Sequence, residues 1–116
     1  EYVNIYNPKN YPTDGDHPRF DDLVYVDKHV QPSSHQCLPA LMQQFYGKID
    51  GPTAIQVAAM EASGNMHAAI YDWGSRTFYI SNASPTQDGP VVPAYERQFL
   101  SLDMDTQLFD ATLAHA

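Results

Sequence analysis

The chain has 116 residues, of which 43% are hydrophobic and 17% are charged, a composition typical of one folded domain with a modest core. Its formal net charge is −8, and its six Lys and Arg residues are scattered along the sequence. Nucleic acids and anionic membranes are bound by clustered basic residues, so this charge pattern argues against both as partners. No apolar stretch approaches the roughly 20 residues of a transmembrane helix.

Residues 1–20 are rich in Tyr, Asn, Pro and Asp, and no helical or strand periodicity persists there. Asn-Pro steps favour extended and turn conformations. We therefore predict an irregular arm over residues 1–20 that lies on another surface. The sequence starts at Glu1, without Met and without a charged-then-apolar leader. This start is expected of a processed chain or a fragment, and equally of an engineered chain.

The first regular elements are expected to be a strand and a helix. The β-prone run Leu23–Val26 predicts a short strand. A helix should begin at Gln36 or Cys37, because Pro39 is tolerated only in a first turn. Gly47 should be the residue after its C-cap, a place where glycine is common. The apolar residues of this helix recur at helical spacing: Leu38, Leu41, Met42 and Phe45.

A second helix is expected after a short connection. Asp50 or Gly51 can cap its N-terminus, and Pro52 would fall in its first turn. We expect this helix to end at Gly64. One side of it carries mostly small residues suited to close packing against another element: Ile55, Ala58, Ala59 and Ala62.

Two β-prone runs flank Gly74-Ser75 and predict a hairpin with a two-residue turn. The predicted register places Trp73 opposite Arg76, Tyr71 opposite Phe78, Ala69 opposite Ile80 and His67 opposite Asn82. One face would then carry Tyr71, Phe78, Ala69 and Ile80, and the other would carry Ile70, Tyr79, Ala68 and Met66. Because both faces are apolar, we expect the hairpin to be covered on both sides, as in a layered fold.

Beyond a loop over residues 85–90, the run Arg97–Leu102 predicts a further strand. Asp105 is expected to cap a last short helix. That helix would carry Leu108, Phe109, Thr112 and Leu113. The predicted order is arm, strand, two helices, three strands and a helix, so the sequence indicates an α+β fold.

The residue types that most often carry chemistry form no complete catalytic or metal-binding motif. Cys37 cannot form an internal disulfide, because it is the sole cysteine. We interpret it as a buried small apolar residue. The alternatives are a disulfide to another chain and a reactive thiol. A thiol–imidazole pair with His29 or His35 is weakly supported, since His35 would lie on a different helix face from Cys37. Neither a metal site nor a cofactor is predicted. The histidines lack the spacing of a zinc site: His17, His29, His35, His67 and His115. The N-terminal aspartates lack the residue order of a calcium-binding loop: Asp14, Asp16, Asp21 and Asp22.

His67 and Asn82 form the most interesting predicted pair, because both lie among apolar hairpin residues. We predict that they hydrogen-bond with each other as a buried structural pair, with ligand binding as the alternative. Glu96 and Arg97 are interpreted as a surface pair, with anchoring of the last strand as the alternative. Asn82-Ala83-Ser84 is an N-glycosylation sequon and predicts a glycan on Asn82, although Pro85 disfavours its use.

A family resemblance rests on the order of several segments: Leu38, Leu41, Phe45, Tyr46-Gly47-Lys48-Ile49, the run Ser63–Asp72, the strand Thr77–Ala83 and the run Pro93–Leu102. Its core is the run Gly64–Asp72, which reads Gly-Asn-Met-His, then one variable residue, then Ala-Ile-Tyr-Asp. Over residues 19–109 the chain resembles the C-terminal part of the acyl-coenzyme A:6-aminopenicillanic acid acyltransferase-like family. Within that family of N-terminal-nucleophile (Ntn) hydrolases, it is most similar to the acid-ceramidase-like eukaryotic branch.

The resemblance implies an αββα sandwich in which residues 21–116 are the C-terminal segment of a larger domain and the hairpin belongs to a central sheet. It also implies a precursor that cleaves itself before a Cys, whose thiol becomes the nucleophile and whose α-amine becomes the base. The implied substrates are amides or thioesters of acyl chains. Here the chain opens with Glu1 and Cys37 is internal, so no residue matches the nucleophile motif and no catalytic residue is assigned.

Three hypotheses follow. The first is a scaffold segment of a secreted or lysosomal Ntn amidase or acyltransferase, which is not catalytic alone and needs a companion chain or the N-terminal part of the same precursor. The second is a non-catalytic structural or interaction protein on the same scaffold, favoured by the eight Tyr residues. The third is a stand-alone thiol enzyme that uses Cys37 and a nearby histidine.

Overall fold

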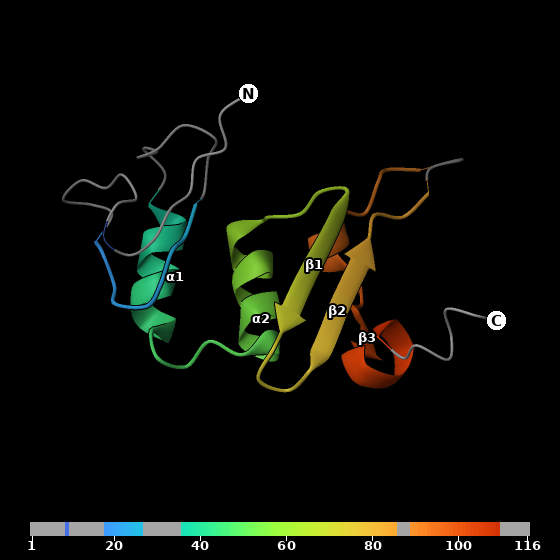
Figure 1. Cartoon of the computed structure of the whole chain (residues 1–116). Helices are drawn as coiled ribbons and strands as arrows, with labels where there is room; N and C mark the ends of the chain where they lie inside the picture. Colours follow the sequence, from blue (N-terminus) through green and yellow to red (C-terminus); the bar gives the residue numbers. More distant parts are fainter. Residues whose placement is uncertain (1–8, 10–17, 27–35, 86–88, 110–116) are drawn as a thin grey trace, which may run out of the picture. The chain divides into compact units, whose positions relative to one another are not determined.

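The computed structural model describes residues 9, 18–26, 36–85 and 89–109. In this part of the chain the fold is α+β, with two α-helices, a three-stranded antiparallel sheet and two short helical turns (Figure 1). The α+β class predicted from the sequence is therefore confirmed. The chain separates into two compact units, Glu1–Gly47 and Lys48–Ala116, so each unit holds one of the two α-helices. Most of the predicted arm, residues 1–20, lies outside the described residues.

In the first unit, helix α1 spans Cys37–Phe45, as the apolar spacing predicts. Pro39 lies in its first turn, where no intrahelical hydrogen bond is lost. The buried side chains of the helix are Pro39, Leu41 and Met42. The chain leaves the helix at Gly47, whose φ of 75° is in the left-handed region. A residue with a Cβ is disfavoured in this conformation, which explains why a glycine follows the helix.

The predicted strand at Leu23–Val26 is wrong, because this segment is irregular. The backbone turns at Asp22, whose φ is 59°, and the Tyr25 hydroxyl donates a hydrogen bond to the Pro18 carbonyl at 2.9 Å. The described part of the first unit holds no strand with which the segment could pair. Without such a partner, a β-prone run cannot satisfy its backbone groups in a sheet.

In the second unit, helix α2 spans Gly51–Glu61 and begins as predicted. The Asp50 side chain caps it by accepting the backbone N–H of Thr53 at 2.8 Å, and a proline occupies its first turn. The predicted end at Gly64 is wrong, because the helix stops at Ala62, which has a left-handed φ of 54°. Hydrogen bonds from the Ala62 backbone N–H to two helix carbonyls hold this alanine in a conformation that usually favours glycine.

The predicted packing row of small residues on α2 is correct only in part, because Ile55 and Ala58 are half-buried but Ala62 is exposed. Gly51 and Val57 are buried, whereas Ala59 is exposed. Gly51 is buried because the sheet lies directly against it: a Cβ atom there would be 2.3 Å from Tyr79 Cε2 and 3.0 Å from Asp72 Oδ2. The N-terminus of α2 therefore approaches the sheet more closely than a residue with a side chain would allow.

Strands β1, His67–Asp72, and β2, Thr77–Asn82, form the predicted antiparallel hairpin. The pairs Tyr71–Phe78, Ala69–Ile80 and His67–Asn82 are in register, as predicted. The turn differs, because the ladder closes at Asp72 and Thr77, so four residues rather than two connect the strands. Asp72 causes the difference: its Oδ1 accepts the backbone N–H groups of Gly74 at 3.1 Å and Ser75 at 3.2 Å, an arrangement in which an acidic side chain stabilises a turn.

Strand β3, Leu100–Asp103, pairs antiparallel with β2, which gives the sheet order β1-β2-β3. The predicted strand over Arg97–Leu102 is thus correct in kind, but it begins and ends later than predicted. Before it, Ala94–Glu96 form a 3-10 turn, η1, that was not predicted. The turn holds Arg97 out of the sheet, because its backbone N–H bonds back to Ala94 at 3.1 Å instead of to β2.

After β3 the chain forms one π-helical turn, η2, over Met104–Leu108. Its N-cap is Asp103, not the predicted Asp105, because Asp103 Oδ1 accepts the backbone N–H of Thr106 at 2.8 Å. Of the side chains predicted for this helix, Leu108 and Phe109 are exposed. The other two, at positions 112 and 113, lie outside the described residues.

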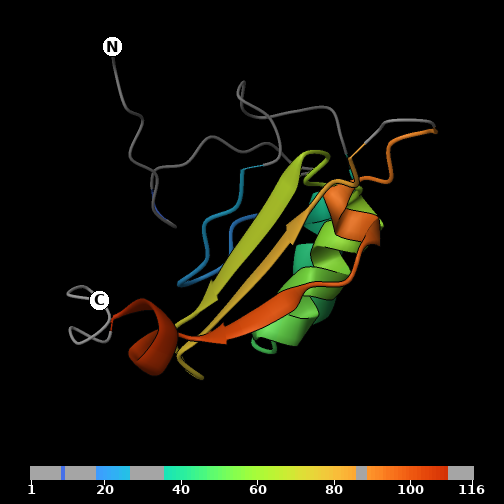
Figure 2. The same ribbon diagram turned by 90° about the vertical axis from the view of Figure 1, so that its right-hand side faces the viewer.

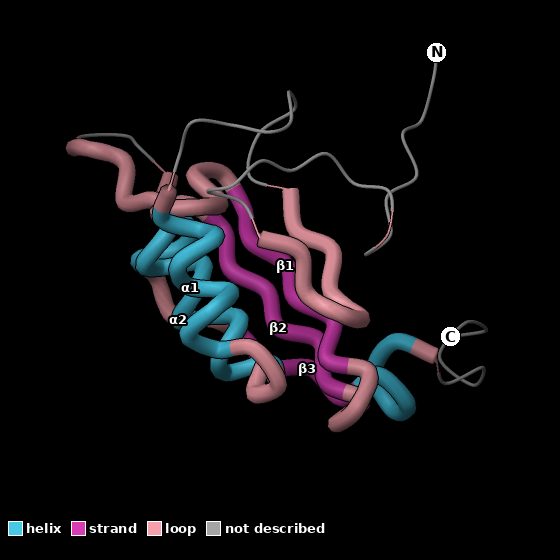
Figure 3. The backbone as a smooth tube through the Cα atoms, turned by 90° about the vertical axis from the view of Figure 1, so that its left-hand side faces the viewer, coloured by secondary structure: helices cyan, strands magenta, loops and turns pink. Residues whose placement is uncertain are grey.

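The core of the second unit, within its described residues, is small and draws on α2, η1 and η2. Figures 2 and 3 show α2 along one face of the sheet. Helix α2 packs on β1, and η1 contacts β1, β2 and α2. Among the described residues of this unit, the buried apolar side chains are Val57 of α2, Ala94 of η1 and Met104 of η2, of which Ala94 and Met104 have 0% exposure.

Candidate functional site

The two faces of the sheet have different surroundings. Residues paired across a ladder share a face, so Ile70 and Asp72 lie on the same face as Tyr79 and Ser81. This is the face against α2, because Tyr79 and Asp72 lie next to Gly51. The second face, which we call the open face, carries neither α2 nor η1, and its residues are His67, Ala69, Tyr71, Phe78, Ile80, Asn82, Leu100 and Leu102.

The open face is rich in apolar and aromatic groups that remain accessible. Tyr71 is 56% exposed and Leu100 is 65% exposed, while Phe78, Ile80 and Leu102 are half-buried. A sheet face of this composition normally packs against another layer of protein. The expectation that the hairpin is covered on both faces is met only on the face against α2, because within the described second unit the open face leaves Tyr71 56% exposed. Met66, assigned to one of the predicted faces, lies outside β1 and is 73% exposed.

Four aromatic rings form a row at the turn end of the sheet. Tyr71 stacks on Phe78 with ring centroids 4.6 Å apart, and it also stacks on Trp73 at 6.3 Å. Trp73 stacks in turn on Phe109, the residue after η2, at 6.4 Å. The Arg76 guanidinium carbon lies 5.7 Å from the Trp73 ring centroid, so a cation–π contact adds to the row.

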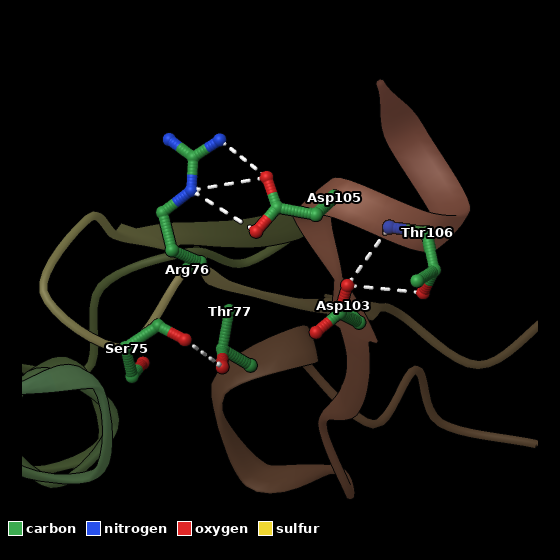
Figure 4. Close-up of polar contacts among 6 residues, drawn as sticks. All are labelled: Ser75, Arg76, Thr77, Asp103, Asp105 and Thr106. Carbon is green, nitrogen blue, oxygen red and sulfur yellow. Dashed lines mark hydrogen bonds and ion pairs between the residues drawn. The ribbon is translucent and has the colours of Figure 1, made fainter. Parts of the chain in front are cut away.

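Arg76 connects this row to η2 through an ion pair with Asp105 (Figure 4). Its Nη2 is 2.5 Å from Asp105 Oδ1, and its Nε donates to the same oxygen at 3.2 Å. The hydrogen bonds that Arg76 donates to the Asp105 carboxylate raise the pKa of Arg76 above its usual value. Both side chains are exposed, so the pair orients the turn and η2 more than it stabilises the fold.

A cavity of about 250 Å³ opens at the other end of β2. Its lining residues come from β2, from the segment after η1 and from β3: Ile80, Ser81, Asn82, Arg97, Gln98 and Leu100. Arg97 Nη1 donates a hydrogen bond to the backbone carbonyl of Asn82 at 2.7 Å. No carboxylate in the described part of the chain forms an ion pair with Arg97.

A network of hydrogen bonds holds the segment that carries Arg97. The buried Ser81 hydroxyl donates to the Ala94 carbonyl at 2.8 Å, and the Ala94 backbone N–H donates to the Asn65 carbonyl at 3.0 Å. Further along, Ser84 accepts the backbone N–H of Val92 through its hydroxyl oxygen at 2.9 Å. These contacts fix η1 against the sheet, so the position of Arg97 beside the cavity is set by the fold.

The predicted His67–Asn82 pair is only partly correct. The two residues are partners in the ladder, as predicted, but both are exposed, and neither side chain shows a hydrogen bond to the other. They lie at the end of the hairpin, where strand pairing stops and water reaches the side chains. The surface-pair interpretation of Glu96 and Arg97 gives way to its alternative, because Arg97 anchors its segment to β2.

The other predicted site residues are dispersed or lie outside the described residues. Cys37 is the first residue of α1, half-buried and without a disulfide. Asp21 and Asp22 are exposed. The remaining candidates are not described: His17, His29, His35, His115, Asp14 and Asp16. Among the described residues, no three His, Cys, Asp or Glu side chains gather in a way that could hold a metal ion.

Two residues that hold the fold around the site, Asp72 and Ser81, were not predicted from the sequence. Asp72 directly precedes Gly74-Ser75, and an acid at that place is a recognised turn signal. Ser81 alternates with Tyr79 on the helix side, so its burial follows from the period of the strand. Its acceptor, the Ala94 carbonyl, lies in a turn that no local pattern indicates.

No helix in the described part of the chain combines the length and the apolar character needed to cross a bilayer.

No protein-family model matches the sequence, and no solved structure matches it. The chain is similar to two curated proteins of Dictyostelium discoideum. It is 40% identical to Protein dcd1A over 119 aligned positions, which cover 91% of this chain and 26% of that protein. It is 36% identical to Protein dcd1B over 102 positions, which cover 81% of this chain and 20% of that protein. The chain thus spans only about a quarter or a fifth of the length of these relatives.

Proposed function

We propose that this chain is a scaffold segment of a Cys-type Ntn amide hydrolase or acyltransferase. In this proposal, the sheet β1-β2-β3 is part of an αββα sandwich. A companion chain, or another part of the same precursor, supplies the second sheet and the N-terminal Cys nucleophile. The proposed substrates are amides or thioesters of acyl chains, and this chain alone is not catalytic.

The observation that carries the proposal is the asymmetry of the sheet. An αββα sandwich stacks two sheets face to face and places helices on the outer face of each. Here α2 covers one face, while the open face presents Tyr71 and Leu100 at 56% and 65% exposure. A half-sandwich would have this arrangement, since its open face is the one that packs on the second sheet.

The length of the relatives is compatible with this arrangement. Protein dcd1A and Protein dcd1B each extend well beyond the region that aligns with this chain, which leaves room for a second sheet.

We also propose that the parent protein is a secreted or lysosomal glycoprotein that is processed by autoproteolysis. The exposed position of Asn82 at the end of β2 is consistent with a glycan there.

Intact-mass and N-terminal sequence analysis of the natively purified protein tests the proposal. We expect a companion chain that begins with Cys, and hydrolysis of an N-acyl amide by the assembled protein. Replacing that Cys with Ala should abolish both cleavage and hydrolysis. Cys37→Ala is the matched control and should retain both, because Cys37 lies inside the chain at the start of α1. Absence of any Cys-initiated chain from an intact native protein would refute the proposal.

A second candidate function is that of a non-catalytic interaction protein, and the exposed aromatic row favours it. Tyr71, Trp73 and Phe109 are each more than half exposed, and aromatic residues are enriched at protein interfaces. The two functions differ in one measurable respect. An interaction protein would bind its partner through this row without any hydrolysis by the complex, whereas the scaffold proposal requires hydrolysis.

A further inference from the structure

We infer that the cavity beside Arg97 is a binding site for a small carboxylate with a short apolar stem. The site does not depend on the proposed hydrolase function, because it is built entirely from residues of the described second unit. Its three components are a guanidinium group without an acidic partner in the described part of the chain, two apolar side chains and a partly open cavity of limited size.

The guanidinium group supplies the charge. Arg97 is anchored through Nη1 to the Asn82 carbonyl at 2.7 Å, a neutral acceptor that leaves its positive charge uncompensated. Its Nε and Nη2 make no hydrogen bond within the described part of the chain. A guanidinium group with free donors on one edge matches a carboxylate, because two parallel N–H···O bonds can form. Arg76, by contrast, already has Asp105 as its acidic partner.

The apolar part of the ligand would contact Ile80 and Leu100. Both residues line the cavity and lie on the open face of the sheet, where Leu100 is 65% exposed. Gln98 and Asn82 also line the cavity and bring polar groups near the proposed carboxylate. The site therefore combines a charged end with an apolar wall, as required for a ligand that has a carboxylate head and a short stem.

The volume limits the ligand. The cavity holds about 250 Å³, which is below the range of roughly 300 to 1,000 Å³ typical of pockets for drug-sized ligands. A long acyl chain would extend beyond it, so the size favours a short carboxylate. The same chemistry could come from a free carboxylic acid or from a Glu or Asp side chain of a neighbouring protein segment.

Titration of the ¹⁵N-labelled chain with sodium propionate, followed by NMR, tests the site. We expect saturable shifts of the Asn82, Gln98 and Leu100 amides, with a dissociation constant of about 1 mM, as is realistic for so small a ligand. Neutral propionamide and an equal concentration of sodium chloride should not produce them. Shifts that grow linearly without saturation, or equal shifts with propionamide, would overturn the proposal.

Three variants make the test specific. Arg97→Gln removes the charge and should weaken propionate binding at least tenfold, whereas Arg97→Lys keeps the charge and should restore part of the affinity. Arg76→Gln is the control and should bind propionate like the wild type, because Arg76 lies at the turn end of the sheet. The ¹H–¹⁵N spectrum of each variant reports whether it is folded. A folded Arg97→Gln variant with unchanged affinity would contradict the assignment.

A chain-length series measures the size of the site. From acetate to butyrate, affinity should rise by roughly fourfold per methylene, the gain expected for burying one CH₂ group. It should then level off once the cavity is filled. An increase that continued to long-chain carboxylates would overturn the size limit. Repeating the propionate titration with the longer parent protein separates the two sources. A retained response assigns the cavity to a free acid. A lost response that returns when a single Asp or Glu of the parent protein is replaced by Asn or Gln assigns it to that carboxylate side chain.

Discussion

Asp72 Oδ2 accepts the backbone N–H of Gly51 at 2.9 Å, so the last residue of β1 is tied to the first residue of α2. The other carboxylate oxygen of Asp72 accepts the N–H groups of Gly74 and Ser75 in the hairpin turn. One side chain therefore links the start of a helix, the end of a strand and the turn that follows. The contact also explains why the helix lies so close to Tyr79.

Replacing Asp72 should destabilise the second unit in a pH-dependent way. Hydrogen bonds from Gly51 and then from Ser75 hold the pKa of Asp72 below its usual value of 3.8. Because the folded-state pKa is depressed, the stabilisation is present above the unfolded pKa and is lost as pH falls through the folded pKa. In urea unfolding, Asp72→Asn should lower the midpoint at pH 7, and its midpoint should depend less on pH below about pH 4 than that of the wild type. A parallel pH profile for the two proteins would contradict this role.

Gly51→Ala should destabilise the fold by about 1 to 3 kcal/mol, the usual cost of overpacking a close contact. The new Cβ would lie 2.3 Å from Tyr79 Cε2, so the ring or the helix must move. Gly89→Ala is a matched control, because a Cβ there meets nothing within 4 Å. Denaturant unfolding of both variants measures the difference, and equal stabilities would show that α2 does not approach the sheet so closely.

Ser81→Ala should cost about 1 to 3 kcal/mol, because it leaves the Ala94 carbonyl without the hydroxyl that bonds to it at 2.8 Å. Ser81 and Ala94 are both buried, with exposures of 4% and 0%, so water cannot easily replace the lost donor. Ser101→Ala removes a hydroxyl from the exposed strand β3 and should change stability by no more than about 0.5 kcal/mol. Thermal unfolding should separate the two variants clearly; similar melting temperatures would argue against a structural role for the Ser81 hydroxyl.

Ala62→Gly should stabilise the protein by about 1 kcal/mol, because Ala62 has a left-handed φ of 54° that glycine adopts without steric cost. Ala59→Gly provides the contrast. It places glycine in the last turns of the same helix at an exposed position and should destabilise by about 1 kcal/mol. Opposite signs in chemical denaturation are expected for these two substitutions. The same sign for both would mean that the left-handed cap at Ala62 is not maintained in solution.

Much of the second unit could be predicted from local signals. The hairpin register follows from the two β-prone runs placed symmetrically about Gly74-Ser75, and the start of α2 follows from Asp50 and a proline in the first turn. The two failures have different physical causes. Whether Leu23–Val26 forms a strand depends on a distant pairing partner, and the end of α2 at Ala62 depends on hydrogen bonds to its own last turn rather than on residue type.

The candidate site was less predictable than the fold. Arg97 was recognised as an anchor only as an alternative, because its acceptor is a backbone carbonyl, at Asn82, that no side-chain pattern indicates. The expected burial of His67 and Asn82 failed because the hairpin pattern does not show where the sheet ends. The cavity is formed by three separate segments, so predicting it requires knowing where these segments lie in space. Residue spacing along one strand does not give this information.

The strand order β1-β2-β3 has a consequence for how a larger protein could grow around this unit. Within the described part of the unit, β1 and β3 each pair with β2 alone, so each has one edge whose backbone groups can accept a further strand. A segment added at either edge would widen the sheet in its own plane, while a layer on the open face would thicken it. The hydrogen bonds inside the hairpin would stay unchanged in both cases, so the unit can be extended in two independent directions.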